Sequence, residues 1–473
     1  MTQSATPANT TLGQLRADGY RPRTVKEEMR ANLLQRLRDN EPFLPGILGY
    51  DDTVLPQIEN AILAGQDVIL LGERGQAKSR IARSLIGLLD EWVPEVAGAE
   101  LHDDPLEPVS PFARALIAER GDDTPVAWLY REQRYGEKLA TPDITIADLV
   151  GEVDPVKVAE GRYLSDEQTI HYGLLPRTNR GIFAMNELPD LAERIQVGLL
   201  NLMEERDVQI RGYKVRLQLD MFVIASANPE DYTSRGRIIT PLKDRFGAQI
   251  RTHYPEDPEV EIAIVEAERT AFADEASASV PAHMPAFMRE VVAELSQLAR
   301  RSSEVSQRSG VSVRVTISNH ETLLAAALKR AVRLGEPVAA PRISDLPSVI
   351  ASTAGKIELE TLGDDTREDK VIEKLVQRAV VNVFNRHFVL SELLPLIERF
   401  ESGASAEVGA TIPSAAHEHL VDEIPELRRA VARLDVGESP AGVASGVEFV
   451  LEGLHLNRRL NKERRGGGVR YAR

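Results

Sequence analysis

The chain has 473 residues, which is too long for one ordinary domain and predicts two or three. Hydrophobic residues at 42% and charged residues at 27% are typical of soluble globular proteins. The absence of cysteine excludes disulfide frameworks, cysteine-ligated zinc and thiol catalysis. A formal net charge of −16 disfavours binding to nucleic-acid phosphates. No apolar run could span a bilayer and no secretory signal is evident, so we expect a cytoplasmic protein.

The N-terminal part of the chain changes from a polar segment to amphipathic helices and then to a strand. Residues 1–24 show no helical periodicity, and we expect them to be disordered. Apolar residues at helical spacing follow over 25–37 and 51–64. The short apolar run 67–71 then predicts a strand that is buried on both faces of a parallel sheet. A glycine-rich turn and a predicted helix over 79–89 come directly after it.

The middle of the chain continues this alternation of strands and helices. Apolar runs over 181–185 and 221–225 predict two more buried strands, which indicates an α/β sheet with helical crossovers. Residues 208–219 alternate apolar and polar side chains around Gly212, which predicts a β-hairpin. After about residue 255 the pattern is mostly helical.

The last 17 residues, 457–473, form a basic tail with a single acid, Glu463. One interpretation is a solvated, disordered end, as charged glycine-containing termini usually are. The other is a tail that docks a partner or nucleic acid. Its basic residues are Arg458, Arg459, Lys462, Arg464, Arg465, Arg470 and Arg473.

Residues 72–79 have the pattern of a phosphate-binding loop between a buried strand and a helix. In such a loop, successive backbone N–H groups and the helix N-terminus form a positive cradle for phosphates. We expect Lys78 to reach the outer phosphates of ATP and the Ser79 hydroxyl to ligate Mg²⁺. Ala77 stands where the strict pattern has glycine; the alternative is an ordinary strand–turn–helix connection. The predicted nucleotide-binding residues are Gly72, Glu73, Arg74, Gly75, Gln76, Ala77, Lys78 and Ser79.

Two further strand ends carry polar residues that could serve hydrolysis. Glu187 follows the apolar strand 181–185 and could polarise the attacking water. Asn186, just before it, could support Mg²⁺ through a bound water, but it brings no negative charge. Asn228 ends the next strand and could hydrogen-bond the γ-phosphate or the water, or it could simply cap the following turn. Read alone, Glu187 could equally be a solvated acid.

These motifs, followed by Leu-Lys-Asp-Arg-Phe-Gly over 242–247, resemble the AAA+ ATPases of the MoxR and magnesium-chelatase I-subunit group. The resemblance covers roughly residues 41–358, about two thirds of the chain. It implies an α/β fold: a P-loop αβα sandwich with a parallel sheet, then an α-helical lid and a helical C-terminal extension. Ala77 is common in MoxR proteins, whereas Asn186 departs from the usual aspartate and predicts weaker Mg²⁺ binding or turnover.

The resemblance implies further roles and boundaries. Arg245 matches the arginine finger that reaches the nucleotide of a neighbouring subunit, which implies a homo-oligomeric ring, a hexamer. Arg314 matches the second sensor of the lid; for either arginine the alternative is a surface salt bridge. Residues 142–180 resemble the helix-2 insert, and 208–219 the pre-sensor hairpin. The expected domains are the ATPase domain over 25–270, the lid over 280–365 and the extension over 366–473.

The function that the resemblance implies is an ATP-driven chaperone or remodelling motor, in metal insertion or complex maturation. Such proteins act with a von Willebrand A-domain partner, which we expect to be a separate protein. One alternative is a σ54-activator-like transcriptional regulator, although the Gly-Ala-Phe-Thr-Gly-Ala loop of those activators is absent from the sequence. The other is a nucleotide-gated scaffold with little hydrolysis, which Asn186 favours.

Overall fold

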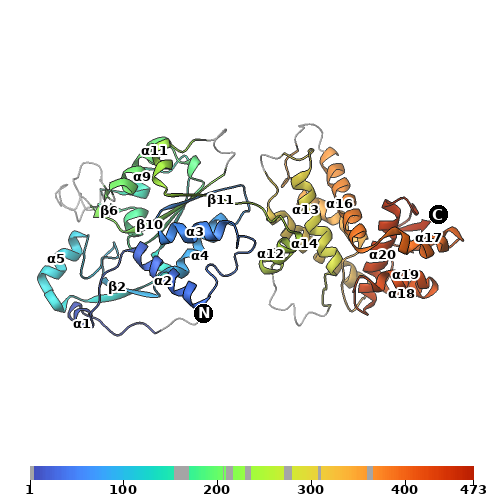
Figure 1. Ribbon diagram of the computed structural model, residues 1–473, viewed down its shortest axis with the longest axis horizontal. Helices are drawn as coiled ribbons and strands as arrows, with labels where there is room; N and C mark the ends of the chain where they lie inside the picture. Colours follow the sequence, from blue (N-terminus) through green and yellow to red (C-terminus); the bar gives the residue numbers. More distant parts are fainter. Residues whose placement is uncertain are drawn as a thin grey trace. The chain divides into compact units, whose positions relative to one another are not determined.

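The computed structural model describes residues 5–153, 170–205, 207–208, 217–228, 236–270, 280–306, 310–359 and 366–473. Two compact units divide the chain, Met1–His253 and Tyr254–Arg473 (Figure 1). The expected ATPase domain over 25–270 therefore ends earlier, at His253. The reason is that helix α12 (Pro258–Glu268) packs against α13 (Ala286–Arg301) and α14 (Val313–Leu334) of the second unit.

The first unit is built on a five-stranded sheet with the order β11-β1-β10-β7-β4, and every neighbouring pair is parallel. Strand β10 lies between β1 and β7, so the ends of the three predicted buried strands are neighbours. This parallel sheet with helical crossovers confirms the predicted α/β fold class. The strands are β1 (Val68–Leu71), β4 (Tyr135–Leu139), β7 (Gly181–Asn186), β10 (Met221–Ala227) and β11 (Ala248–Arg251).

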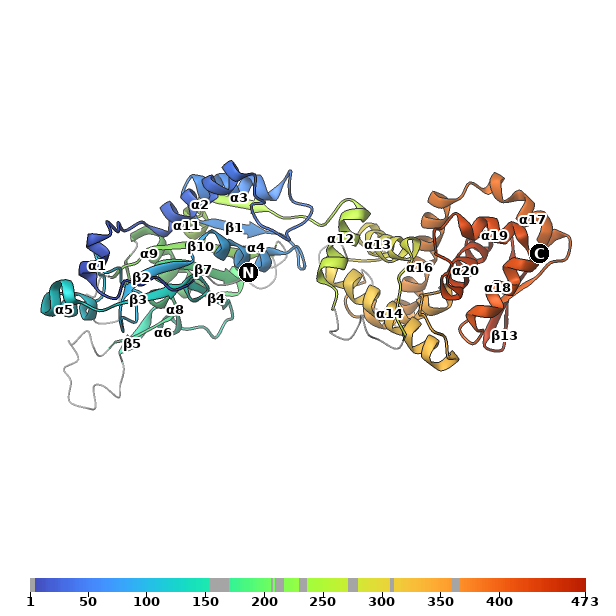
Figure 2. The ribbon, with the colours of Figure 1, turned by 90° about the horizontal axis from the view of Figure 1, so that it is seen from below.

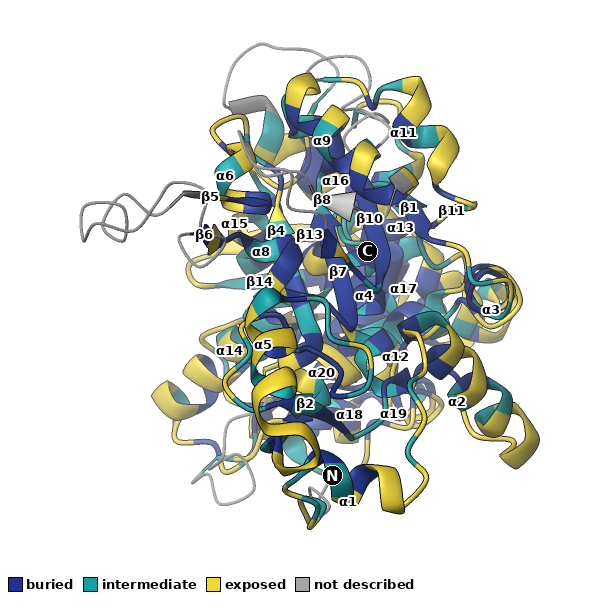
Figure 3. Ribbon diagram, turned by 90° about the vertical axis from the view of Figure 1, so that its left-hand side faces the viewer, coloured by how far each residue is buried: buried dark blue, intermediate teal, exposed yellow. Residues whose placement is uncertain are grey.

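Alternate residues of the central strands face two different cores, which explains why their sequences are apolar throughout. In β1, Val68 and Leu70 belong to one core, and Ile69 belongs to the other. Figure 3 shows the central strands β1, β7 and β10 as buried. Helices α2 (Val25–Asp39), α3 (Val54–Leu63) and α4 (Lys78–Ser84) cover the first face, and α9 (Glu193–Glu205) and α11 (Thr240–Arg245) contribute to the second core.

The expected disorder of residues 1–24 is wrong around helix α1 (Leu12–Ala17). Leu12 and Leu15 are 0% and 2% exposed, and the Thr11 side chain caps the helix by accepting from the backbone of Gln14. The backbone N–H of Leu12 also donates to the carbonyl of Thr124 at 3.0 Å. Two buried leucines three residues apart fix the segment against a part of the chain more than 100 residues away, the turn that ends at Thr124.

Three small antiparallel pairs extend the first unit. Strands β2 (Trp92–Val96) and β3 (Val126–Tyr130) pair beside the main sheet, and β5 (Gly151–Val153) pairs with β6 (Ile170–Tyr172) inside the insert expected over 142–180. Strands β8 (Asp207–Val208) and β9 (Leu217–Gln218) pair at the two ends of the hairpin expected over 208–219. Residues 154–169 and 209–216 lie outside the described part, so the rest of both insertions stays a prediction.

The second unit is mainly helical and has one core. Phe449 lies at its centre: its ring stacks on that of Phe287 with centroids 4.4 Å apart and meets that of Phe384 edge to face at 6.0 Å. This core joins helices from both sides of residue 365, so the expected lid and extension are not separate globules. None of the helices in the described ranges is both long and apolar enough to cross a membrane. Besides α12 to α14, the helices are α15 (Val349–Thr353), α16 (Thr366–His387), α17 (Leu394–Glu401), α18 (Ser414–Glu423), α19 (Pro425–Ala432) and α20 (Pro440–Leu456).

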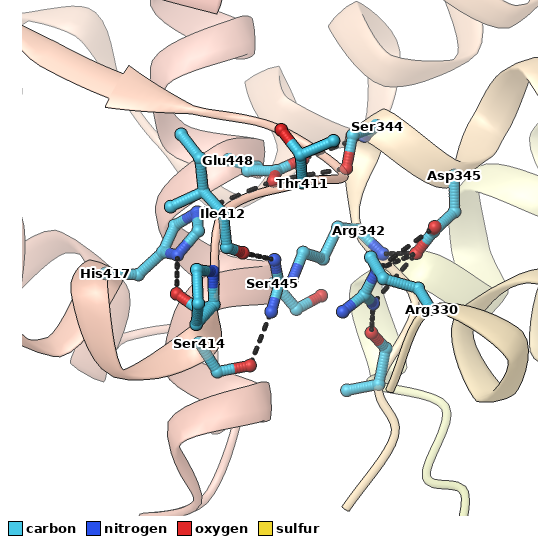
Figure 4. A network of polar contacts seen from close by, with 12 residues as sticks. Arg330, Arg342, Ser344, Asp345, Thr411, Ile412, Ser414, His417, Ser445 and Glu448 are labelled. Carbon is cyan, nitrogen blue, oxygen red and sulfur yellow. Dashed lines mark hydrogen bonds and ion pairs between the residues drawn. The ribbon is translucent and has the colours of Figure 1, made fainter. Parts of the chain in front are cut away.

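A buried polar network also crosses the expected lid–extension boundary (Figure 4). Arg342, 0% exposed, donates to the carbonyl oxygen of Ile412 at 2.8 Å and to the Ser414 hydroxyl. Glu448 accepts from the backbone N–H of Ser344 at 2.8 Å. Buried charges are tolerated only when they are paired and hydrogen-bonded, so this network binds the segment around Arg342 to α18 and α20.

The basic tail is ordered, although most of it is exposed to solvent, which corrects the expectation of a disordered end. Strands β13 (Asn461–Arg465) and β14 (Gly468–Ala472) form a hairpin, and β14 pairs on its other side with β12 (Ala406–Val408) (Figure 2). Tyr471 is 2% exposed, and its hydroxyl donates to the buried carboxylate of Glu452 on α20. The glycines at 466–468 supply the turn, and one buried aromatic residue anchors the sheet.

Candidate nucleotide-binding site

The loop between β1 and α4 contains two left-handed residues. Gly75 has a φ of 76° and Ala77 a φ of 57°. For Ala77 this conformation costs about 1–2 kcal/mol, which a glycine would not incur. At Gly72, a Cβ would lie 1.9 Å from Thr252 Oγ1 and 2.2 Å from Gln76 Oε1, so only glycine fits there. Helix α4 begins at Lys78, and the N–H groups of its first turn have no partners within the helix.

Lys78 is 7% exposed and its ammonium group lies among oxygen atoms of the loop. Nζ donates to the carbonyl oxygens of Gly72 and Glu73, the latter at 2.7 Å, and to Oδ1 of Asn228 at 2.8 Å. The lysine therefore connects the phosphate-binding loop with the end of β10. A phosphate group could take the place of these acceptors because Lys78 is held by neutral oxygens there.

The ends of β7 and β10 bring the other predicted residues to the same edge of the sheet. Asn228 Nδ2 donates to Glu187 Oε2 at 2.6 Å, and Ser79 Oγ donates to Asn186 Oδ1 at 3.3 Å. Glu187 has a φ of 54°, an uncommon conformation for a residue with a side chain. Its backbone N–H donates to Ser226 Oγ at 3.3 Å. These contacts place Ser79, Asn186, Glu187 and Asn228 together with Lys78.

Glu137 on β4 joins this site and was missed by the sequence analysis. Asn186 Nδ2 donates to Glu137 Oε1 at 2.5 Å, and Arg83 donates to both Glu137 oxygens at 2.7 and 3.0 Å. The hydrogen bond and charge of Glu137 raise the pKa of Arg83 above its ordinary value. Because a carboxylate only accepts, it directs the amide NH₂ of Asn186 toward itself and leaves the amide oxygen facing Ser79. The segment 135–139 has no apolar run, so nothing marked it as a sheet strand.

A second supporting group was also missed, on the opposite side of the loop. The Tyr50 hydroxyl lies 3.0 Å from the carbonyl oxygen of Gln76 and 2.8 Å from that of His253. Burial raises the pKa of Tyr50, so the phenol keeps its proton and can donate. Thr252 Oγ1 donates to the Gln76 side chain at 2.6 Å, which fixes the loop to the end of β11. Only the structure identifies these partners, because they lie 26 residues or more from Gln76 in sequence.

The two predicted arginines lie apart from this cluster. Arg245 ends α11, where its side chain is 41% exposed and forms an ion pair with Glu204. Arg314 lies in the first turn of α14 in the second unit, and it is exposed. Neither belongs to the contacts around Lys78. Their roles therefore stay predictions.

The strand order and the loop define a P-loop protein of the AAA+ class. The family description "Sigma-54 interaction domain" matches residues 158–244. The chloroplastic magnesium-chelatase subunit ChlI of Oryza sativa subsp. indica is 30% identical over 268 residues, which cover 53% of this chain and 57% of that protein. Subunit ChlI-1 of Arabidopsis thaliana is 28% identical over 239 residues, covering 49% and 52%. The chain thus spans about half the length of the curated relatives it matches.

Among solved structures, a complex of the magnesium chelatase subunits BchI and BchD matches with a TM-score of 0.35 at 19% identity, covering 70% of this chain and 98% of that chain. The site geometry and the sequence matches make the chain similar to the AAA+ ATPases of the MoxR and magnesium-chelatase I-subunit group.

Proposed function

We propose that this chain is an ATP-hydrolysing remodelling motor that works as a homo-oligomeric ring. The observation that carries the proposal is the convergence of Lys78, Ser79, Glu187 and Asn228 at one edge of the parallel sheet. A phosphate-binding loop alone would serve any nucleotide-binding protein. A carboxylate beside the loop, held by an amide that also contacts the loop lysine, is the added feature that hydrolysis needs.

The donor set of the site fits ATP with Mg²⁺. Lys78 and the first turn of α4 are the groups for the phosphates, while the Ser79 hydroxyl and the Asn186 amide oxygen, 3.3 Å apart, are the hard oxygen donors that Mg²⁺ prefers. Mg²⁺, when bound, neutralises phosphate charge. The remaining predicted residues, Glu73, Arg74, Gly75, Gln76 and Ala77, form the backbone cradle.

Glu187 is the residue proposed to orient and polarise the attacking water. Its backbone lies in the left-handed region, which directs the side chain out of the strand toward Asn228 rather than along the sheet. Asn228 holds the carboxylate through Nδ2 and contacts Lys78 through Oδ1, so the position of the carboxylate depends on the state of the loop. Binding of phosphate by Lys78 would change the hydrogen bonding of Asn228 and thereby that of Glu187.

Arg245 and Arg314 are proposed to act on nucleotide from outside the cluster. The exposure of Arg245 and its ion pair with the equally exposed Glu204 suit a side chain that exchanges this partner for a phosphate of a neighbouring subunit. A surface ion pair contributes roughly 0–1 kcal/mol, so its loss opposes ring assembly only slightly. Arg314 is proposed as the second sensor, and the ring as a hexamer.

The work of the motor is proposed to be metal insertion or complex maturation, together with a separate von Willebrand A-domain protein. The relatives named above are magnesium-chelatase subunits, and this similarity supports the metal-insertion version. A second candidate, a σ54-activator-like regulator, is favoured by the family match over 158–244. That match spans Glu187 and Asn228, the part of the ATPase core that both classes of protein would share. A third candidate is a nucleotide-gated scaffold, favoured by Asn186 in place of aspartate.

The proposal is tested by steady-state Mg²⁺-ATPase activity across protein concentration for the native chain, Glu187→Gln and Arg245→Ala. Specific activity should rise with concentration and disappear in both variants, while both still bind a fluorescent ATP analogue. Mixing the two inactive variants should restore activity, because a mixed interface then has one intact Glu187 and one intact Arg245. Tight ATP binding without turnover in the native chain would support the scaffold instead. Activity independent of concentration would rule out shared interface sites.

A further inference from the structure

The outer strand of the C-terminal sheet is exposed along its whole length. Strand β13 (Asn461–Arg465) is the edge of the order β12-β14-β13, and each of its five residues is exposed. In the part of the chain that the structure describes, no strand pairs with its outer edge. Such an edge offers a row of backbone N–H and C=O groups to an added strand. Native proteins usually protect such edges, and charged side chains alone would be one way to do so.

A pocket of about 170 Å³ opens beside this edge. Engineered apolar cavities of roughly 150 Å³ bind one benzene ring, so the pocket has room for one aromatic or large aliphatic side chain. Partly exposed apolar side chains from four other elements line it, which is unusual for a surface that only has to protect a sheet edge. These side chains are Ile343, Ile350, Val376 and Leu456.

Lys462 and Arg464 of β13 line the same pocket. They are two residues apart in the strand, so their side chains lie on the same face of the sheet. Tyr471, which pairs with Lys462, lies on that face too and is buried against α20. Lys462 donates to Glu452 at 2.7 Å, which neutralises it. Arg464 has no acidic partner among the described residues. The pocket therefore combines an apolar floor with two charged groups on its wall, the acid Glu373 on α16 and the cation Arg464, which lies next to the open strand edge.

The charges of the tail decide between the occupants of this surface. A second copy of the chain is disfavoured, because antiparallel pairing of β13 with itself about Glu463 would place Lys462 opposite Arg464 and Glu463 opposite itself. Nucleic acid is disfavoured because the outward face is not uniformly positive. On that face Glu463 lies opposite Arg470, which in turn lies opposite Glu407. An extended segment with acidic residues and one large apolar side chain can pair with the β13 backbone, form an ion pair with Arg464 and fill the pocket at the same time.

We propose that β13 and this pocket form a docking site for an extended acidic segment of a partner protein. The segment adds a strand to the β13 edge, places its acidic side chains beside Arg464, and seats one aromatic or large aliphatic side chain in the pocket. The site lies wholly within the second unit and does not rest on the proposed ATPase activity.

The probe is a fluorescein-labelled heptapeptide with phenylalanine at its centre, aspartates two positions to either side, and threonine elsewhere. Alternation places phenylalanine and both aspartates on one face of a strand. Binding to the full-length protein is followed by fluorescence anisotropy up to millimolar protein. Replacing phenylalanine by alanine, or the aspartates by lysine, should each weaken binding about tenfold or more. Two further peptides carry N-methyl groups on alternate backbone nitrogens, one on the N–H groups that face β13 and the other on those that face away from it. The first should lose binding and the second should keep it.

Matched protein variants separate this site from general attraction to basic residues. Arg464→Glu and the pocket-filling Val376→Phe should each weaken binding about tenfold, whereas Arg378→Glu should not, since Arg378 is exposed on the same helix as Val376 but does not line the pocket. Circular dichroism of each variant checks that the unit is folded. Equal loss in all three variants, no saturable binding, or equal effects of the two N-methylated peptides would overturn the proposal. The proposal would also be overturned if a labelled single-stranded oligonucleotide bound as tightly as the peptide and Arg464→Glu abolished that binding. That result would show that the surface binds polyanions in general.

Discussion

Replacing Asn186 by aspartate, the residue that the family resemblance implies at this position, should destabilise this protein. In the native chain the Asn186 amide nitrogen donates to Glu137 Oε1 at 2.5 Å. The substitution Asn186→Asp replaces that donor with an oxygen of similar position and negative charge. Two carboxylates then face each other at the end of β7 and β4. The hydrogen bond is lost, and a like-charge contact takes its place.

The size of the effect follows from the separation and exposure of the two groups. Two unit charges relaxed to about 4 Å repel by about 4 kcal/mol at the effective dielectric constant of a protein surface, and by about 1 kcal/mol in bulk water. The Glu137 side chain is 20% exposed, so the contact lies between these limits. The lost hydrogen bond adds about 1 kcal/mol. Arg83 offsets part of the repulsion, as it already donates to both Glu137 oxygens. We expect a net loss of about 2–4 kcal/mol.

Thermal unfolding of four proteins in the absence of nucleotide and Mg²⁺ measures this effect. For a domain of this size, 1 kcal/mol corresponds to about 2–4 °C, so Asn186→Asp should lower the transition of the first unit by roughly 5–10 °C. Adding Glu137→Gln should restore most of the loss, because the glutamine can donate to the new aspartate. Glu137→Gln alone is the matched control, and the four proteins form a double-mutant cycle.

The result that refutes this reasoning is an Asn186→Asp protein as stable as the native chain, with Glu137→Gln acting additively. Such an outcome would mean that the two side chains are not coupled. If coupling is confirmed, the single reversion is the wrong way to raise turnover, and the double variant is the one to assay.

Three further outcomes test other parts of the structure. Ala77→Gly should raise the free energy of unfolding by about 0.5–1 kcal/mol in urea titrations, because the left-handed strain exceeds the added freedom of the unfolded chain; a lower stability would contradict the assigned φ. Gly72→Ala should weaken binding of a fluorescent ATP analogue tenfold or more, because its Cβ would displace Thr252; an unchanged Kd would show that the loop adapts. Burial raises the pKa of Glu448, but the nearby His417 and Arg342 and the hydrogen bond from the Ser344 backbone outweigh it and leave that pKa below its ordinary value of 4.5. The ionised Glu448 therefore stabilises the second unit above pH 4.5, and this stabilisation is lost as the pH falls below 4.5, which thermal unfolding followed by circular dichroism should show. Glu448→Gln should be less stable than the native chain at pH 7 by about 3 kcal/mol, and its stability should not fall in this way below pH 4.5.

The sequence predicted the sheet and most of the site because their signals are local. A strand buried on both faces reads as a continuous apolar run, as 67–71 and 221–225 do. The polar residue that ends such a strand must lie at the carboxyl edge of the sheet. Parallel pairing then brought Lys78, Glu187 and Asn228 together without any further information.

The features that the sequence did not reveal depend on partners far away in the chain. Glu137 lies on an edge strand whose residues are mostly polar, so its place beside Asn186 follows only from the pairing of β4 with β7. Leu12 and Leu15 looked too sparse for a core, and the tail too charged for a sheet. In each case a few buried side chains outweigh the average character of the segment. Tyr471 is one such side chain: its hydroxyl donates to Glu452, and its burial holds the tail in an ordered hairpin where disorder was expected.

The same pairing bears on whether Asn186 marks a scaffold or a motor. A neutral residue at this position removes one negative charge, which predicts weaker binding of Mg²⁺. Glu137, however, orients the amide so that its oxygen faces Ser79, and the geometry of an oxygen donor is therefore kept. Because Arg83 forms an ion pair with Glu137, Glu137 orients the Asn186 amide without adding net negative charge to the site. The expected consequence is a higher Mg²⁺ requirement with Glu187 still able to act, which favours a slow motor over a scaffold.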